Sequence, residues 1–99
     1  MAMKRQPKPL TFFGKRAKLN DRTGYLVAGK PDAVELFLDS ITGAGDECLA
    51  SVDIMGTECV YEIRKSPAAA IAAAERKTLK LLNRLASSIG HRLVKKGGK

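Results

Sequence analysis

The chain has 99 residues, of which 44% are hydrophobic and 28% are charged, and its formal net charge is +8. This length predicts one domain, and the share of apolar residues excludes a wholly disordered chain. The sequence holds no apolar run long enough for a membrane span, and no apolar stretch follows its basic N-terminus as in a signal peptide. We therefore expect a cytoplasmic protein that makes no contact with membranes.

The charged residues are segregated into three blocks along the chain. Residues 1–30 hold eight Lys or Arg against one acid, residues 31–63 hold eight acids and no Lys or Arg, and residues 64–99 hold ten Lys or Arg against one acid. A well-mixed surface would not separate its charges in this way, and a surface of one sign is typical of a protein with a charged partner. The net positive charge favours a nucleic acid or an acidic protein surface.

The N-terminal third is predicted to be an arm followed by a hairpin. Residues 1–9 hold two prolines and three cations, so we expect a flexible basic arm there. Residues 10–19 are predicted to form a strand, 20–24 a turn rich in residues that tolerate tight angles, and 25–28 the return strand. We expect at least one of the two phenylalanines in this hairpin to be buried.

Residues 31–42 are predicted to form a short helix. Pro31 suits the first helical position, and acids at 32 and 35 would complement the positive end of the helix dipole. The apolar residues fall at the spacing of one helix face, and they are Val34, Phe37, Leu38 and Ile41.

A second hairpin is predicted over residues 47–64, with Met55 and Gly56 at the turn and Asp53 opposite Glu58. In this register one face is apolar and the other is acidic, as in a sheet covered on one side. The predicted buried face consists of Cys48, Ala50, Val52, Ile54, Cys59, Tyr61 and Ile63.

The last predicted element is a long helix with Ser66 as its N-cap and Pro67 as its first residue, ending near Gly90. An alanine-rich stretch over 68–74 favours this helix. One side carries Ile71, Ala74, Thr78, Leu82, Leu85 and Ile89. The opposite side carries Arg76, Lys77, Lys80, Arg84 and His91.

Together these elements predict a single α+β domain over residues 10–96, in the order ββαββα, followed by a frayed tail at 97–99. Its simplest architecture is a four-stranded, mainly antiparallel sheet with both helices on one face.

Two groups of cations are the candidate binding residues. The sequence contains no metal-ligand cluster and no motif that names a reaction, so we expect no catalytic residue, metal or cofactor. We predict a small, non-enzymatic nucleic-acid-binding accessory or regulatory protein of a bacterium, phage or plasmid, with DNA and RNA both open. The residues predicted to contact phosphates are Lys15, Arg16, Lys18 and Arg22 of the first hairpin and Arg76, Lys77, Lys80 and Arg84 of the last helix.

Two other functions stay open. A polarised surface without a catalytic cluster also fits a phage-type inhibitor that binds a host protein or nucleoprotein complex. A toxin-like ribonuclease is the third alternative, with Tyr25, Tyr61 and Arg64 as its candidate residues. The acidic block at 31–63 would pair within the fold, with a partner, or with a second copy in a homodimer or a head-to-tail assembly.

Overall fold

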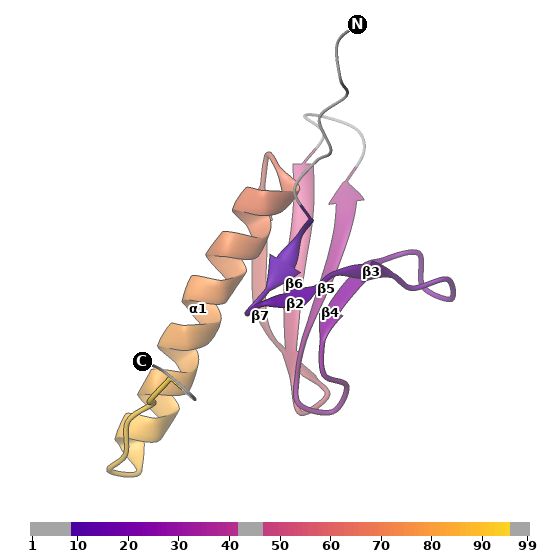
Figure 1. Ribbon diagram of the computed structural model, residues 1–99. Coiled ribbons are helices and arrows are strands. Elements are labelled where there is room, and N and C mark those ends of the chain that lie inside the picture. The colour runs from indigo at the N-terminus through magenta and orange to yellow at the C-terminus, as the bar shows by residue number, and fades with distance from the viewer. Residues whose placement is uncertain (1–8, 42–46, 96–99) are drawn as a thin grey trace, which may run out of the picture.

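The computed structural model describes residues 9–41 and 47–95 and shows an α+β fold. Within these residues, β3, β4, β5, β6 and β7 form one antiparallel sheet in that order, β1 pairs with β2, and α1 lies against the sheet (Figure 1). The predicted arm, except Pro9, and the predicted tail lie outside the described residues. The elements are β1 (Thr11–Phe12), β2 (Lys15–Arg16), β3 (Lys18–Leu19), β4 (Leu26–Gly29), β5 (Val34–Ile41), β6 (Glu47–Ile54), β7 (Thr57–Arg64) and α1 (Pro67–Ser88).

The α+β class is confirmed, but the order ββαββα is wrong because the described part of the predicted first helix, residues 31–41, forms a turn and the strand β5. Pro31 and Asp32 occupy the middle of a tight turn in which the Ala33 N–H donates to the Lys30 carbonyl (3.1 Å), and Asp32 has φ of +66°. Pro at the second position and positive φ at the third are the features of a type II turn. Pro31, which the sequence analysis placed at the start of a helix, therefore lies in the hairpin turn between β4 and β5.

The segment after this turn is the central strand β5. Its Leu36 and Leu38 are buried, whereas Phe37 between them lies on the other face of the sheet. Gly29 precedes the turn with φ of +102°, and a Cβ at this position would clash with the Val34 carbonyl oxygen. The β4–β5 hairpin thus depends on glycine at this position.

The predicted hairpin over 47–64 is confirmed as β6 and β7, joined at Met55 and Gly56. Asp53 pairs with Glu58 as predicted, but a bulge between Val52 and Asp53 shifts the rest of the register by one residue. A shift of one residue turns every later side chain to the other face. The β7 half of the predicted buried face is therefore wrong: Val60 and Glu62 are buried, Ile63 is half-buried, and Cys59 and Tyr61 are exposed.

The first hairpin is more broken than predicted. Phe13 and Gly14 both have positive φ and form a tight turn, so the predicted strand over 10–19 divides into β1, β2 and β3. Phe12 is 1% exposed and lies in the core, which confirms that one of the two phenylalanines is buried.

The C-terminal helix α1 begins as predicted, with the Ser66 side chain accepting a hydrogen bond from the Ala69 N–H (3.2 Å) and Pro67 as the first residue. It ends before Gly90, whose φ of +79° suits a helix terminus. The buried Thr78 is satisfied because its hydroxyl donates to the Ala74 carbonyl (2.7 Å).

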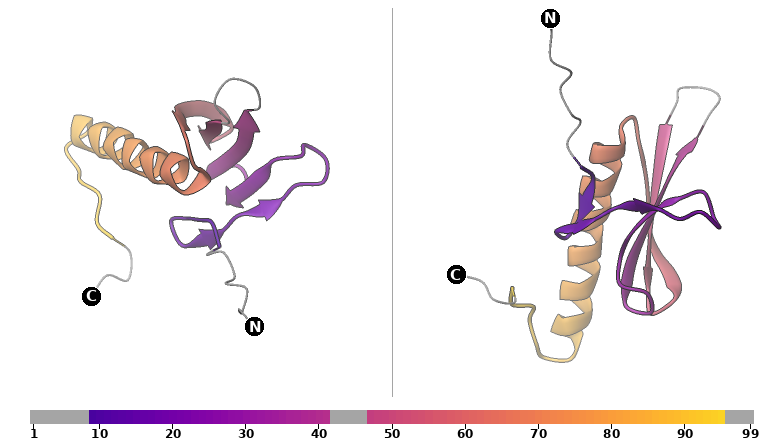
Figure 2. Two further views of the ribbon diagram at one scale, coloured as in Figure 1. Left: turned by 90° about the horizontal axis from the view of Figure 1, so that it is seen from above. Right: turned by 45° about the vertical axis from the view of Figure 1, so that its right-hand side comes forward.

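One layer of sheet and one helix make up the core, and the β1–β2 hairpin lies beside α1 on the side away from β7 (Figures 1 and 2). Alanines on α1 let the helix backbone lie close to the sheet. The predicted four-stranded sheet with two helices is wrong, because residues 34–41 of the predicted first helix form β5, and the sheet has five strands. The core residues are Phe12, Ala28, Leu36, Leu38, Cys48, Ala50, Val52, Val60, Ala70, Ile71 and Ala74.

Candidate nucleic-acid interface

A groove of about 560 Å³ runs between α1 and the edge strand β7. Three of the predicted helix cations, Lys77, Lys80 and Arg84, line its helix side, because residues three and four positions apart share one helix flank. Apart from Tyr61, a candidate residue of the ribonuclease alternative, the residues on the β7 side were not assigned to a site by sequence reasoning. The other lining residues are Cys59, Val60, Tyr61, Glu62 and Leu81.

The fourth predicted helix cation, Arg76, lies next to this groove. It lines a smaller hollow of about 120 Å³ with Arg64, Lys77 and Lys80. The structure therefore brings the four predicted helix cations together along the β7 edge, and it adds Arg64.

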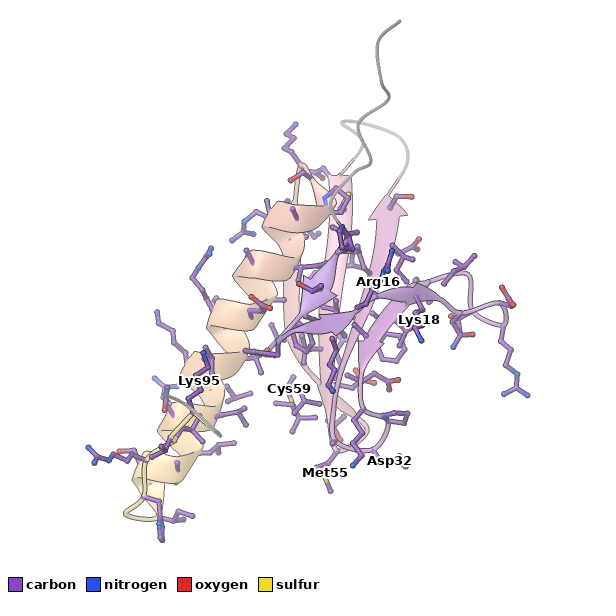
Figure 3. All side chains as sticks on the ribbon, viewed as in Figure 1. Arg16, Lys18, Asp32, Met55, Cys59 and Lys95 are labelled. Atoms are coloured by element: carbon purple, nitrogen blue, oxygen red, sulfur yellow. The ribbon has the colours of Figure 1, made fainter. Side chains whose placement is uncertain are left out.

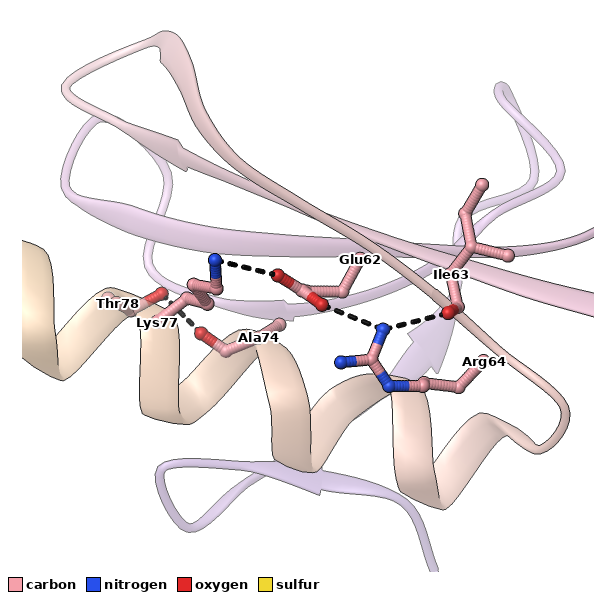
Figure 4. A network of polar contacts seen from close by, with 6 residues as sticks. All are labelled: Glu62, Ile63, Arg64, Ala74, Lys77 and Thr78. Carbon is pink, nitrogen blue, oxygen red and sulfur yellow. Dashed lines mark hydrogen bonds and ion pairs between the residues drawn. The ribbon is translucent and has the colours of Figure 1, made fainter.

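Glu62 partly neutralises one end of the groove. Its Oε1 lies 2.8 Å from Arg64 Nη1 and its Oε2 lies 3.7 Å from Lys77 Nζ (Figure 4). Arg64 Nη1 also donates to the Ile63 carbonyl (2.8 Å). Because the bulge turns Glu62 inward, this carboxylate links β7 to α1. Lys80 and Arg84 make no ion pair with any other described residue, so they carry the free positive charge of the groove.

The first-hairpin cations lie elsewhere. Lys18 lies on β3, the edge strand at the far side of the sheet from β7, and Arg16 lies on the neighbouring β2 (Figure 3). Lys15 on β2 and Arg22 in the β3–β4 loop are exposed. The β1–β2 hairpin contacts α1 at Glu75, on the helix side away from the groove.

That placement separates the two groups of cations. The Phe13 N–H donates to Glu75 Oε2 (2.7 Å), and Lys77 points about 200° around the helix from Glu75. The structure therefore places the first-hairpin cations away from the groove rather than on one surface with the helix cations.

The residues of the ribonuclease alternative are not brought to one place. Tyr25 and Tyr61 line a hollow on the outer face of the sheet, which is the face turned away from α1. Arg64 lies on the other face of β7, where it pairs with Glu62. These three side chains do not converge.

The outer face of the sheet collects acidic residues. Glu35 pairs across β5 and β6 with Asp53, and Asp53 pairs across β6 and β7 with Glu58, so three carboxylates stand in one row. Burial raises the pKa of Glu35 above its ordinary 4.5, and the charges of Asp53 and Asp32 raise it further. Like charges directly opposite each other destabilise a sheet.

We expect Glu35→Gln to raise the melting temperature at pH 7. A carboxyl group whose pKa is higher in the folded than in the unfolded protein contributes most to stability at pH values below its unfolded pKa. That contribution is lost as the pH rises from about 4.5 through the raised folded-state pKa of Glu35. The gain should be at most about 1 kcal/mol, the scale of cross-strand pairs, and it should vanish at about pH 3, where both states are protonated. Thermal unfolding at both pH values measures it, and a lower melting temperature at pH 7 would contradict it.

No helix within the described residues is both long and apolar enough to cross a membrane. Comparison of the chain with protein-family models, with curated proteins and with solved structures found no match. The fold and the groove therefore define only a class, a small α+β protein with a basic groove beside an edge strand, and its function is inferred from that groove.

Proposed function

We propose that this protein is a small, non-enzymatic nucleic-acid-binding protein whose α1–β7 groove holds phosphates. The observation that carries the proposal is the row of Lys77, Lys80 and Arg84 on one flank of α1. Seven helical residues rise about 10 Å, which matches roughly three nucleotides along one strand of duplex DNA. The two free cations of this row, Lys80 and Arg84, pair with no acid in the part of the chain that the structure describes.

The groove favours backbone contacts over reading of sequence. Lysine and arginine bound to phosphates fix position but carry no sequence information. Tyr61, 56% exposed at the rim of the groove, offers a ring on which one base can stack. The first-hairpin cations lie outside the groove, and we propose that they hold phosphates independently of it.

The salt dependence of binding to a labelled random duplex and a matching single strand tests this proposal. Each phosphate contact should contribute a slope of about −0.9 in log affinity against log salt for a duplex and about −0.7 for a single strand. Three groove contacts alone therefore predict a duplex slope of about −3, and further phosphate contacts by the first-hairpin cations would make the slope steeper. No binding to DNA or RNA at low salt would overturn the proposal.

A second candidate function, a protein-binding inhibitor, is favoured by the position of β7. This strand has eight residues and is one of the two edge strands of the sheet. In an antiparallel ladder, every second residue of such a strand points its N–H and C=O away from its neighbour. An extended acidic segment of a partner would add to β7 by main-chain hydrogen bonds, with the groove cations beside it. Absence of nucleic-acid binding at low salt would make this the leading function.

A further inference from the structure

The outer face of the sheet is turned away from α1 (Figure 2), and it carries a hollow of about 260 Å³ with aromatic walls. Tyr25, Phe37 and Tyr61 line this hollow. The chain has five aromatic residues, and the other two, Phe12 and Phe13, lie in the β1–β2 hairpin. Every aromatic ring outside that hairpin therefore lines one site on the sheet.

The pairing of the strands explains the space between two of these rings. Ser51 on β6 pairs with Phe37 on β5 and with Tyr61 on β7, so a small side chain stands between two large ones. Neighbouring strands lie about 4.8 Å apart, which separates the two ring-bearing positions by about 10 Å. A planar group with a ring on each side needs about 7–8 Å, because carbon atoms in contact lie about 3.5–4.0 Å apart. The space over Ser51 therefore admits one planar group.

The Phe37 ring is supported from the side of β4. Tyr25 meets it edge to face, with 6.4 Å between the ring centroids and 79° between the ring planes. Such a contact stabilises the orientation of both rings. Tyr61 on the edge strand is exposed and has no ring beside it at this distance among the described residues. One wall of the space is therefore fixed, and the other is free to turn towards a ligand.

Carboxylates stand on both sides of this row. In the next cross-strand row, Asp53 lies between Glu35 and Glu58. On the other side Asp39 lines the hollow, and its Oδ1 accepts a hydrogen bond from the Ser40 N–H (2.9 Å). The hollow is thus lined by three carboxylates, those of Asp39, Asp53 and Glu58, and by no described Lys or Arg.

These carboxylates have no cation of their own within the described residues. The ion pairs found there belong to Glu62, which lies on the opposite face. Like charges directly opposite each other destabilise a sheet, so a cation bound beside Asp53 would relieve an existing repulsion. Among the described residues no three ligating side chains gather as they do at a metal site. The carboxylates therefore fit a larger cation that meets them separately.

We propose that this hollow binds the guanidinium group of an arginine side chain of a partner protein. A guanidinium is planar, stacks on aromatic rings and carries five N–H donors that match carboxylates. It would lie over Ser51 between Phe37 and Tyr61 and donate to the carboxylates around them. This inference goes beyond the proposed function and does not depend on it, although Tyr61 borders both the groove and the hollow.

Three short peptides with blocked ends test the chemistry of the site: Gly-Arg-Gly, Gly-Lys-Gly and Gly-citrulline-Gly. Citrulline has the planar shape of arginine without its charge. Nuclear magnetic resonance of the isotope-labelled full chain, freed of nucleic acid, follows their binding at about 0.1 M salt, where the Debye length is about 10 Å.

The arginine peptide should give saturable shifts at the residues of the hollow. It should bind at least about fivefold more tightly than the lysine peptide and at least about tenfold more tightly than the citrulline peptide, because only a guanidinium is both charged and planar. An arginine peptide that binds no more tightly than the other two, or that shifts no residue of the outer face, would overturn the proposal.

Two pairs of variants locate the site. Ser51→Leu fills the space between the rings, whereas Ser40→Leu adds the same side chain at an exposed strand position outside the hollow. Asp53→Asn removes one charge of the hollow and keeps the size of the side chain, so it stays informative if leucine at position 51 perturbs the sheet. Asp21→Asn removes the same charge from the exposed turn between β3 and β4.

The first variant of each pair should weaken binding of the arginine peptide by at least about fivefold, the scale of one charge-assisted contact, and its control should leave that binding nearly unchanged. Equal effects within both pairs would contradict the site. Ser51 and Asp53 lie outside the groove, so failure of the proposed function would leave these results intact.

The oligomeric state shows whether a second copy supplies the arginine. We expect the wild type to sediment as a monomer, because each copy carries a net charge of +8 and equal charges oppose association. A wild type that self-associates, and becomes monomeric on Arg5→Gln, would assign the hollow to the N-terminal arm of a second copy and overturn its assignment to a partner protein.

Discussion

Replacement of Phe12 by alanine should lower the free energy of unfolding by about 3–5 kcal/mol, the usual cost of removing a large buried aromatic side chain. Phe12 is 1% exposed and belongs to the core cluster, although its strand has only two residues. The β1–β2 hairpin pairs with no strand of the main sheet, so Phe12 anchors it to the core. Chemical denaturation of the variant and the wild type measures the loss.

The neighbouring Phe13 is the matched control. It is 42% exposed, and its ring meets Phe12 edge to face at 4.6 Å between centroids. Such a ring contact is worth about 0.5–1.5 kcal/mol, so Phe13→Ala should cost about 1 kcal/mol. Equal losses for the two substitutions would show that the hairpin does not orient its two rings as described.

The double substitution Lys80→Glu with Arg84→Glu should weaken nucleic-acid binding by at least about 100-fold. Both side chains are exposed and have no acid partner among the described residues, so the substitutions reverse the free charge of the groove without breaking an internal ion pair. Removal of two phosphate contacts should also reduce the salt slope by about two. Fluorescence anisotropy with one labelled oligonucleotide across a salt series measures both quantities, at protein concentrations where the chain is monomeric.

A variant of equal net charge separates the groove from the overall charge of the protein. Lys30 lies in the β4–β5 turn and Lys65 in the β7–α1 loop, and neither lines the groove. Lys30→Glu with Lys65→Glu should therefore lower affinity far less than the groove variant and leave the salt slope nearly unchanged. If both variants weaken binding equally, the groove is not the interface, and long-range attraction by the net charge explains the binding.

Local sequence signals identified the elements that depend on short-range chemistry. Ser66 and Pro67 start α1 and Gly90 follows its end, because capping and positive φ are properties of single residues and their neighbours. The β6–β7 hairpin was predictable from its alternation and its turn. The four helix cations of the candidate interface were likewise predictable. Residues three or four positions apart lie on the same side of a helix, so spacing alone brings these cations together.

The segment after Pro31 shows where such signals are ambiguous. Val34 and Leu38 fit both a helical face and one face of a strand, and Pro31 fits both a helix start and a turn. Pairing of β5 with β4 and β6 decides between them, since only that pairing places Leu36 in the core beneath α1. Glu35 and Asp39, which alternate with Leu36 and Leu38 along this segment, were a strand signal that the helical reading did not weigh.

The sequence by itself determined the α+β class, the terminal helix with its caps, the second hairpin and the segregation of charge along the chain. The tertiary structure decided the fifth strand, the inward position of Glu62, the groove beside β7 and the separation of the helix cations from the first-hairpin cations. The physical reason is that each of these depends on pairing or packing between distant segments. A single bulge between Val52 and Asp53 exchanges Tyr61 for Glu62 in the interior, and local spacing contains no signal of it.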